Sequence, residues 1–248
     1  MTHTDTERPV DASELIPLET QCEWSRTSLG DSYVHVLDDD ERAELHEALQ
    51  YARSHTDDVL GITAADFPLP TLATRLRAIA GDLVEGRGVA LIRGVERARY
   101  TADEASAIYW GVGAHLGRPW PQNAKGHLLG DVTDQGKRYD DPTSRGNELG
   151  GVGLPFHSDG SDLVGLFCLD DGASGGDSLV ANLVSIHNEL VRDAPELAAE
   201  LYAPLPYDAR GEEGSGQRAW YTMPAFQRRG DRLFCRYIRP YIRSSMRH

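Results

Sequence analysis

Two side chains with metal-binding chemistry, His157 and Asp159, are separated by a single residue in the segment 154–160, Leu-Pro-Phe-His-Ser-Asp-Gly. In an extended chain, residues i and i+2 point to the same side, so the imidazole and the carboxylate can reach one metal ion as neighbouring ligands. A histidine from elsewhere would complete the two-histidine, one-carboxylate triad that holds non-haem Fe(II) with open coordination positions. By itself the pair also fits a surface hydrogen bond, so metal binding is favoured only if the surrounding sequence supports it.

Apolar residues at helical spacing predict three helices in the first half of the chain, near 40–55, 70–85 and 101–116. The last of these begins with a capping box formed by Thr101 and Glu104. The apolar run between Gly88 and Gly94 predicts a short buried strand. Residues 1–37 show no such pattern and are expected to be irregular.

The second half changes character, because short apolar runs alternate there with glycine-rich turns. A helical insert is expected at about 185–202, and Arg228–Asp231 predicts a hairpin turn between the last two strands. This order predicts an α+β fold, a β-sandwich or barrel core backed by helices, in one domain over 38–248. The expected strands lie near 127–134, 154–158, 162–169, 178–184, 204–209, 219–227 and 232–238.

Composition excludes several classes of protein. A formal net charge of −14 argues against general nucleic-acid binding, which requires a clustered basic surface. No apolar run is long enough to cross a bilayer, and the polar N-terminus is unlike a signal peptide, so a cytoplasmic protein with no membrane partner is expected. The three widely spaced cysteines, Cys22, Cys168 and Cys235, lack a CxxC motif, and the two in apolar runs, Cys168 and Cys235, are expected to be buried thiols rather than disulfides.

Around and after His157 the chain contains His-Ser-Asp-Gly-Ser-Asp at 157–162, the apolar run 163–169 and Gly-Gly-Asp-Ser-Leu at 175–179. These segments resemble those of the TauD/TfdA, or taurine dioxygenase-like, family. Upstream, three further segments resemble the first core strand, the following helix and the loop before the iron site, and they lie at 88–94, 113–119 and 121–126. The resemblance covers roughly residues 85–245 and depends on the order and spacing of several segments.

This resemblance implies a double-stranded β-helix (jelly-roll) core and an oxidoreductase that uses Fe(II), 2-oxoglutarate and O₂. It implies that His157 and Asp159 are iron ligands and that the Ser178 hydroxyl contacts 2-oxoglutarate. The implied reaction hydroxylates or desaturates a small polar or anionic molecule while 2-oxoglutarate is oxidatively decarboxylated to succinate. Halogenases of this kind replace the carboxylate by a small residue, so Asp159 favours hydroxylation.

The substrate itself is not readable from the sequence, although polar residues near the implied site are candidates to bind it. Eight arginines and only one acidic residue lie between Gln217 and His248, and they fit either scattered ion pairs or contacts to an anionic substrate. A homo-oligomer is left open. The candidate substrate-binding residues are Gln122, Asn123 and Lys125 in the loop before the iron site and Arg236 and Arg239 near the last strands.

The family pattern also needs a second histidine on a late strand and an arginine for 2-oxoglutarate. Only His187 and His248 follow Asp159, and neither is placed like the second ligand. The sequence therefore predicts a C-terminally truncated family member with an incomplete jelly roll and weak iron binding. Three alternatives stay open: an impaired homologue that acts as a binding or regulatory partner, a cupin-like or other mononuclear iron oxygenase that needs no 2-oxoglutarate, and a fragment with no independent role.

Overall fold

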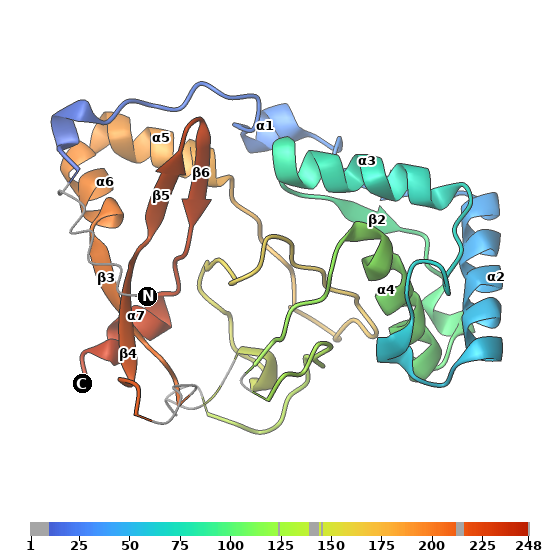
Figure 1. Cartoon of the computed structure of the whole chain (residues 1–248). Coiled ribbons are helices and arrows are strands. Elements are labelled where there is room, and N and C mark those ends of the chain that lie inside the picture. The colour runs from blue at the N-terminus through green and yellow to red at the C-terminus, as the bar shows by residue number, and fades with distance from the viewer. Residues whose placement is uncertain (1–9, 124, 139–143, 145, 212–215, 248) are drawn as a thin grey trace. The chain divides into compact units, whose positions relative to one another are not determined.

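The structure is a computed structural model, and it describes residues 10–123, 125–138, 144, 146–211 and 216–247 (Figure 1). The chain forms two compact units. The helical unit consists of Arg26–Gly130 and Ser161–Val180. The hairpin unit consists of Met1–Ser25, Asp131–Gly160 and Ala181–His248. No helix in the described ranges is both long and apolar enough to cross a membrane.

The helical unit contains the three predicted helices. Their apolar faces meet in one buried core that includes Leu49, Phe67, Leu76 and Ile108. The helices and short elements of this unit are α1 (Arg26–Leu29), β1 (Val34–Val36), α2 (Asp39–His55), η2 (Val59–Gly61), α3 (Leu72–Glu85), β2 (Leu91–Arg93), η3 (Arg97–Arg99) and α4 (Ala102–Leu116). The predicted capping box of α4 is confirmed, because Glu104 N–H donates to Thr101 Oγ1 at 3.2 Å and Thr101 N–H donates to Glu104 Oε2 at 2.8 Å.

The strand predicted between Gly88 and Gly94 is present as β2, but it is less buried than expected. It pairs in parallel with β1, from Val34 opposite Leu91 to Val36 opposite Arg93. Leu91 is exposed, and among the described residues β2 pairs with β1 alone. The partner strand β1 lies inside the segment 1–37, which the sequence predicts to be irregular.

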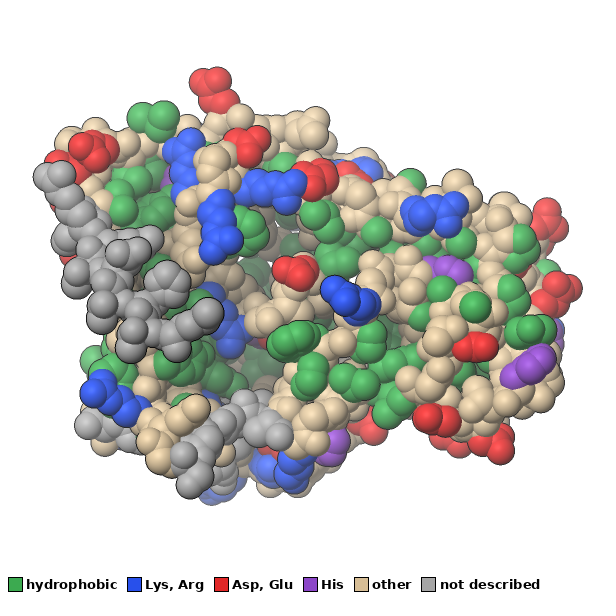
Figure 2. Space-filling model, viewed as in Figure 1, with side chains coloured by type: hydrophobic (Ala, Val, Ile, Leu, Met, Phe, Trp, Pro, Cys, Tyr) green, Lys and Arg blue, Asp and Glu red, His purple; other side chains and the backbone are tan. Residues whose placement is uncertain are grey.

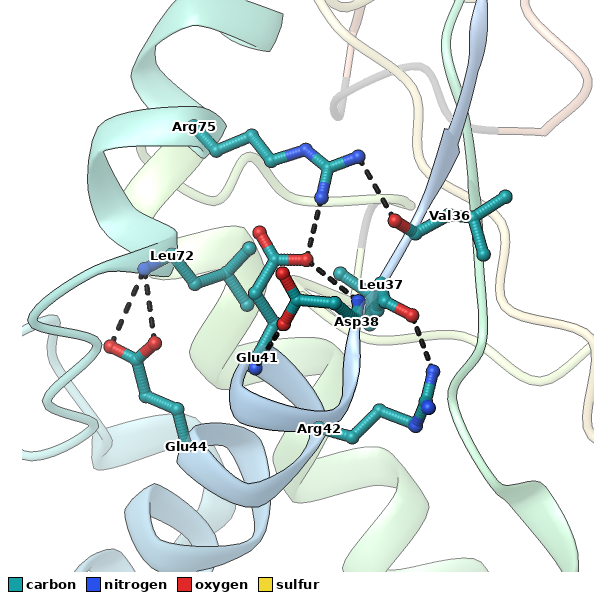
Figure 3. A network of polar contacts seen from close by, with 8 residues as sticks. All are labelled: Val36, Leu37, Asp38, Glu41, Arg42, Glu44, Leu72 and Arg75. Atoms are coloured by element: carbon teal, nitrogen blue, oxygen red, sulfur yellow. Dashed lines mark hydrogen bonds and ion pairs between the residues drawn. The ribbon is translucent and has the colours of Figure 1, made fainter.

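A network of polar contacts joins α2 to α3 (Figure 3). The Thr71 side chain, at the start of α3, makes no capping hydrogen bond, so the first N–H groups of this helix need another acceptor. Glu44 of α2 supplies it, accepting from Thr71 N–H at 2.6 Å and from Leu72 N–H at 3.1 Å. A carboxylate is favourable at this end of a helix, where the helix dipole is positive.

The same network holds β1 against the two helices. Glu41 is buried, and its Oε2 atom accepts from Asp38 N–H at 3.0 Å and from Arg75 Nη1 at 2.5 Å. The second Arg75 amino group donates to the carbonyl of Val36 in β1 at 3.1 Å. The buried carboxylate is therefore neutralised by a guanidinium that also fixes the position of the strand.

The hairpin unit contains the late strands that the sequence predicts. Two antiparallel pairs form, β3 with β4 and β5 with β6, and the second closes through the predicted turn, where Gly230 has a φ of 65°. The helical insert is split, because Pro195 lacks the N–H that a continuous helix needs. The elements are η1 (Ala12–Glu14), η4 (Gly146–Glu148), α5 (Leu183–Asp193), α6 (Pro195–Tyr202), β3 (Pro204–Asp208), β4 (Trp220–Pro224), β5 (Phe226–Arg229), β6 (Arg232–Cys235) and α7 (Arg239–Ser245).

Four predicted strands, near 127–134, 154–158, 162–169 and 178–184, are wrong. These segments form no strand in the structure, and their apolar side chains are largely exposed, with Leu166 and Leu179 each 76% exposed. An apolar run predicts that its side chains need burial, but a strand forms only where a second segment pairs with its backbone N–H and carbonyl groups. Apolar side chains are also visible at the surface in Figure 2.

The α+β class is confirmed, but the described residues do not form a jelly roll. Their strands pair in three separate two-stranded sheets. The helices and the late hairpins are local in sequence, whereas a jelly roll requires pairing between distant strands, and the segments expected to supply those strands are unpaired here.

Candidate metal centre

The side chains of His157 and Asp159 lie together in the hairpin unit. His157 Nε2 is 4.0 Å from Asp159 Oδ1, and the two side chains are 36% and 53% exposed. The alternation of an extended chain therefore places both side chains on one side, as their spacing predicts. Metal binding by the pair stays a prediction.

The hydrogen bonding of His157 leaves the correct ring nitrogen available for a metal. Its Nδ1 atom lies 2.8 Å from the carbonyl oxygen of Pro155. A carbonyl can only accept, so Nδ1 carries the proton at this contact, and in the neutral ring Nε2 is then the nitrogen whose lone pair is free to bind a metal. Metal-binding histidines commonly donate their second N–H to a carbonyl in this way. The same geometry also fits an exposed ion pair, which would contribute little to stability.

The donor set fits Fe(II) by type, although the two donors are not yet at ligand spacing. Two adjacent ligands, each about 2.1 Å from a metal, stand roughly 3 Å apart, so a bound ion would draw this pair about 1 Å closer. Within the described part of the chain, no three histidine, cysteine, aspartate or glutamate side chains gather as a metal site. His248, the last residue, lies outside the described residues.

Ser158, which lies between the two candidate ligands, binds the segment that follows β6. Its N–H donates to the Tyr237 carbonyl at 3.0 Å, and its hydroxyl donates to the Cys235 carbonyl at 3.1 Å. The same hydroxyl accepts from Tyr237 N–H at 2.8 Å. The spacing of His157 and Asp159 does not predict this role of Ser158. The alternation that places its neighbours on one side indicates that Ser158 faces the other way.

Arg236 is the candidate substrate-binding residue that the structure places beside the pair. Its Nη1 atom is 3.5 Å from the Ser158 carbonyl, and a Cβ added at Gly160 would lie 2.9 Å from the same nitrogen. The half-buried guanidinium therefore lies directly against the residue that follows Asp159. Arg239 is exposed at the start of α7 in the same unit.

The other predicted binding residues belong to the helical unit. Asn123 shapes a turn, because its Oδ1 atom accepts from Lys125 N–H at 3.0 Å and from His127 N–H at 3.3 Å. Gln122 donates from its side chain to the Trp120 carbonyl at 3.0 Å, and Lys125 is exposed. These contacts account for Asn123 and Gln122 as structural residues, and their binding roles stay predictions.

Ser178 also belongs to the helical unit, and it is exposed. It follows Gly175 and Gly176, which have φ values of 77° and 81°. Positive φ angles of this kind favour glycine, so a tight turn explains both glycines whether or not the loop binds a ligand.

The described residues contain no disulfide bond between the three cysteines, as the sequence predicts. The expectation that Cys168 is buried is wrong, because its apolar segment forms no strand and its side chain is exposed. Cys22 and Cys235 are partly buried, and burial raises the pKa of the Cys235 thiol. A thiol with a raised pKa is a poor nucleophile at neutral pH.

His187 has a structural environment. It is fully buried in α5, where Nε2 lies 2.8 Å from the Tyr202 hydroxyl and Nδ1 lies 3.1 Å from Asn188 Oδ1. The ring also makes an edge contact with Phe226. Both ring nitrogens are thus engaged inside the hairpin unit, in agreement with the sequence argument that His187 is not the second iron ligand.

Acidification should destabilise the hairpin unit through His187. Burial lowers the pKa of His187 below its ordinary value of 6.5, with a smaller contribution from Arg228 in the same direction. As pH falls below 6.5, the unfolded chain therefore binds a proton that the folded chain does not, and the free energy of unfolding decreases. Urea unfolding from pH 7.5 to 5 should show this loss, and His187→Gln should reduce it. An equal loss in the variant would contradict the assignment.

The comparisons with known proteins agree with the sequence pattern. The family described as Taurine catabolism dioxygenase TauD, TfdA family matches residues 54–245. FR-33289 synthase of Streptomyces rubellomurinus is 33% identical over 225 residues, which cover 90% of this chain and 66% of the synthase. A taurine hydroxylase-like protein of Stachybotrys chartarum is 26% identical over 183 residues, covering 71% of this chain and 46% of that protein. The chain thus spans less than two thirds of the length of either relative.

Proposed function

Because the chain belongs to the TauD, TfdA family of dioxygenases, we propose that it binds Fe(II) through His157 and Asp159 and uses 2-oxoglutarate to oxidise a small polar or anionic molecule. One observation carries this proposal beyond the family match. His157 Nδ1 is engaged by the Pro155 carbonyl, which leaves Nε2 as the free nitrogen of the neutral ring, and Nε2 lies 4.0 Å from Asp159 Oδ1, where one metal ion could be bound by both side chains.

The iron, with 2-oxoglutarate and O₂, would supply the oxidising chemistry, with succinate as a product. The chain's own residues would hold the metal ion and orient its ligands. Pro155 fixes the ring of His157, and Asp159 supplies negative charge and takes a position that a halide would otherwise need. Hydroxylation or desaturation is therefore proposed rather than halogenation. Membership of the family also supports a jelly-roll core, which remains part of the proposal.

We propose that Arg236 binds an anionic group of the substrate. Its guanidinium lies against Gly160, next to a candidate iron ligand, and it is partly withdrawn from solvent, where its attraction to an anion is screened less. A planar guanidinium pairs well with carboxylate and phosphate groups. We include Gln122, Asn123, Lys125 and Arg239 as further substrate contacts, and Ser178 as a contact to 2-oxoglutarate.

Anaerobic titration of the 248-residue chain with Fe(II) and 2-oxoglutarate tests the proposal. A visible charge-transfer band that needs both components is expected, with weak affinity because only two protein ligands are identified. Admitting O₂ should then consume 2-oxoglutarate and produce succinate. Absence of the band at saturating Fe(II) would overturn the proposal. Oxygen uptake without 2-oxoglutarate would replace it with a 2-oxoglutarate-independent iron oxygenase.

A further inference from the structure

The residue between the two candidate ligands makes an unusual connection to the rest of the hairpin unit. In a regular ladder, each backbone N–H and carbonyl pairs with the backbone of the neighbouring strand. Here the Ser158 hydroxyl takes the place of a backbone acceptor for Tyr237 N–H and also donates to the Cys235 carbonyl. With the backbone bond from Ser158 N–H to the Tyr237 carbonyl, one serine engages three polar groups of the opposite segment.

The opposite segment, 235–237, is itself fixed from its other side. Arg236 N–H donates to the Ala225 carbonyl at 2.9 Å, and the buried Tyr207 hydroxyl donates to the Arg236 carbonyl. The backbone groups of residue 236 thus point toward β3 and the β4–β5 junction, while those of Cys235 and Tyr237 point toward Ser158. The segment is therefore a rigid support, and Ser158 is the residue through which the candidate ligands are attached to it.

This attachment fixes two parts of the site at once. His157 and Asp159 flank Ser158 on one segment, and Arg236 lies between Cys235 and Tyr237 on the other. The contact between Arg236 Nη1 and the backbone of Gly160 is close enough that an added Cβ would lie 2.9 Å from the nitrogen. The position of the guanidinium relative to the ligand pair thus depends on the register that the Ser158 hydroxyl maintains.

We propose that Ser158 is a positioning residue, whose hydroxyl holds the His157–Asp159 pair in register with Arg236 so that a metal and an anionic group can be bound side by side. This inference rests on the proposed function, because it assigns a purpose to the register only if the pair binds metal. Removing the hydroxyl leaves Tyr237 N–H and the Cys235 carbonyl without their partner, while the single backbone bond of Ser158 remains. The ligand segment can then rotate about that bond.

The test compares Ser158→Ala with Ser158→Thr, which keeps the hydroxyl. Ser161→Ala is the matched control, because the Ser161 hydroxyl donates only to the nearby Leu163 carbonyl, at 3.0 Å. Two readouts are needed: hydrogen exchange at the Tyr237 amide without metal, and affinity for Co(II), used as a spectroscopic probe for the iron site. Ser158→Ala should exchange faster at Tyr237 and bind Co(II) about 10- to 100-fold more weakly. Ser158→Thr and Ser161→Ala should stay close to the parent chain.

The outcomes separate this inference from the proposed function. Parent-like exchange at Tyr237 in Ser158→Ala would overturn the inference whatever the metal does. Suppose that Ser158→Ala binds Co(II) as strongly as the parent chain, and that His157→Ala in the parent chain weakens Co(II) binding. The inference is then overturned, and the proposed function stands. A parent chain that binds Co(II) without dependence on His157 would overturn the proposed function and the inference together. Weaker binding in Ser158→Ala that is restored in Ser158→Thr supports both.

Discussion

A chain carrying His157→Ala should lose Fe(II) affinity by on the order of 100-fold or more, so that titration no longer saturates. Loss of residues that only support a metal ligand already costs roughly 10- to 100-fold, and removing a ligand itself should cost at least as much. The visible band with 2-oxoglutarate should disappear in parallel. Asp159→Ala should behave in the same way, because each change leaves one protein donor of the identified pair.

His55→Ala is the matched control for this substitution. His55 is also an exposed histidine whose Nδ1 atom lies close to a backbone carbonyl, that of Tyr51, at 2.7 Å. It therefore shares the hydrogen-bonding pattern of His157 but has no part in the proposed site. Its removal should leave Fe(II) affinity unchanged. Equal losses in His55→Ala and His157→Ala would show that metal binds nonspecifically to surface histidines and would contradict the proposed ligands.

The candidate ligand pair was predictable because its geometry is local. The i, i+2 spacing of His157 and Asp159 places both side chains on one side of an extended chain, whether or not a regular strand forms. The sequence could not show that Pro155 fixes the histidine ring, or that Arg236 lies against Gly160. The contact between Arg236 and Gly160 depends on how two distant segments pack, and the sequence of neither segment predicts that packing.

In the fold as well, the elements that depend on local sequence were predictable, and those that depend on distant segments were not. The helices α2, α3 and α4 were predictable because capping residues and 3.6-residue spacing act within each helix. The β5–β6 hairpin was predictable because its turn is contained within its own sequence. The segment 162–169 was predicted as a strand and is not one, because strand pairing depends on a partner segment that its own residues do not specify.

Gly111→Ala should destabilise the helical unit by about 1–2 kcal/mol, although alanine is the better helix former. A Cβ added at Gly111 in α4 would lie 2.3 Å from Cγ of Phe67, far inside contact distance. Phe67 is fully buried in the core, so its ring has no free space into which it can move. Overpacking of this kind costs about 1–3 kcal/mol, and the helix propensity of alanine returns up to about 1 kcal/mol. Urea unfolding followed by far-UV circular dichroism measures the difference.

Gly113→Ala, two residues further along α4, should have the opposite effect. Gly113 is exposed, and a Cβ added there would meet no heavy atom within 4 Å. Only the helix propensity then changes, so the variant should be more stable by up to about 1 kcal/mol. The sequence alone does not distinguish these two glycines, and their opposite signs follow from the position of the Phe67 ring. If both substitutions stabilise the chain, Phe67 does not pack against Gly111 as described, and α4 would have to contact the core through a different face.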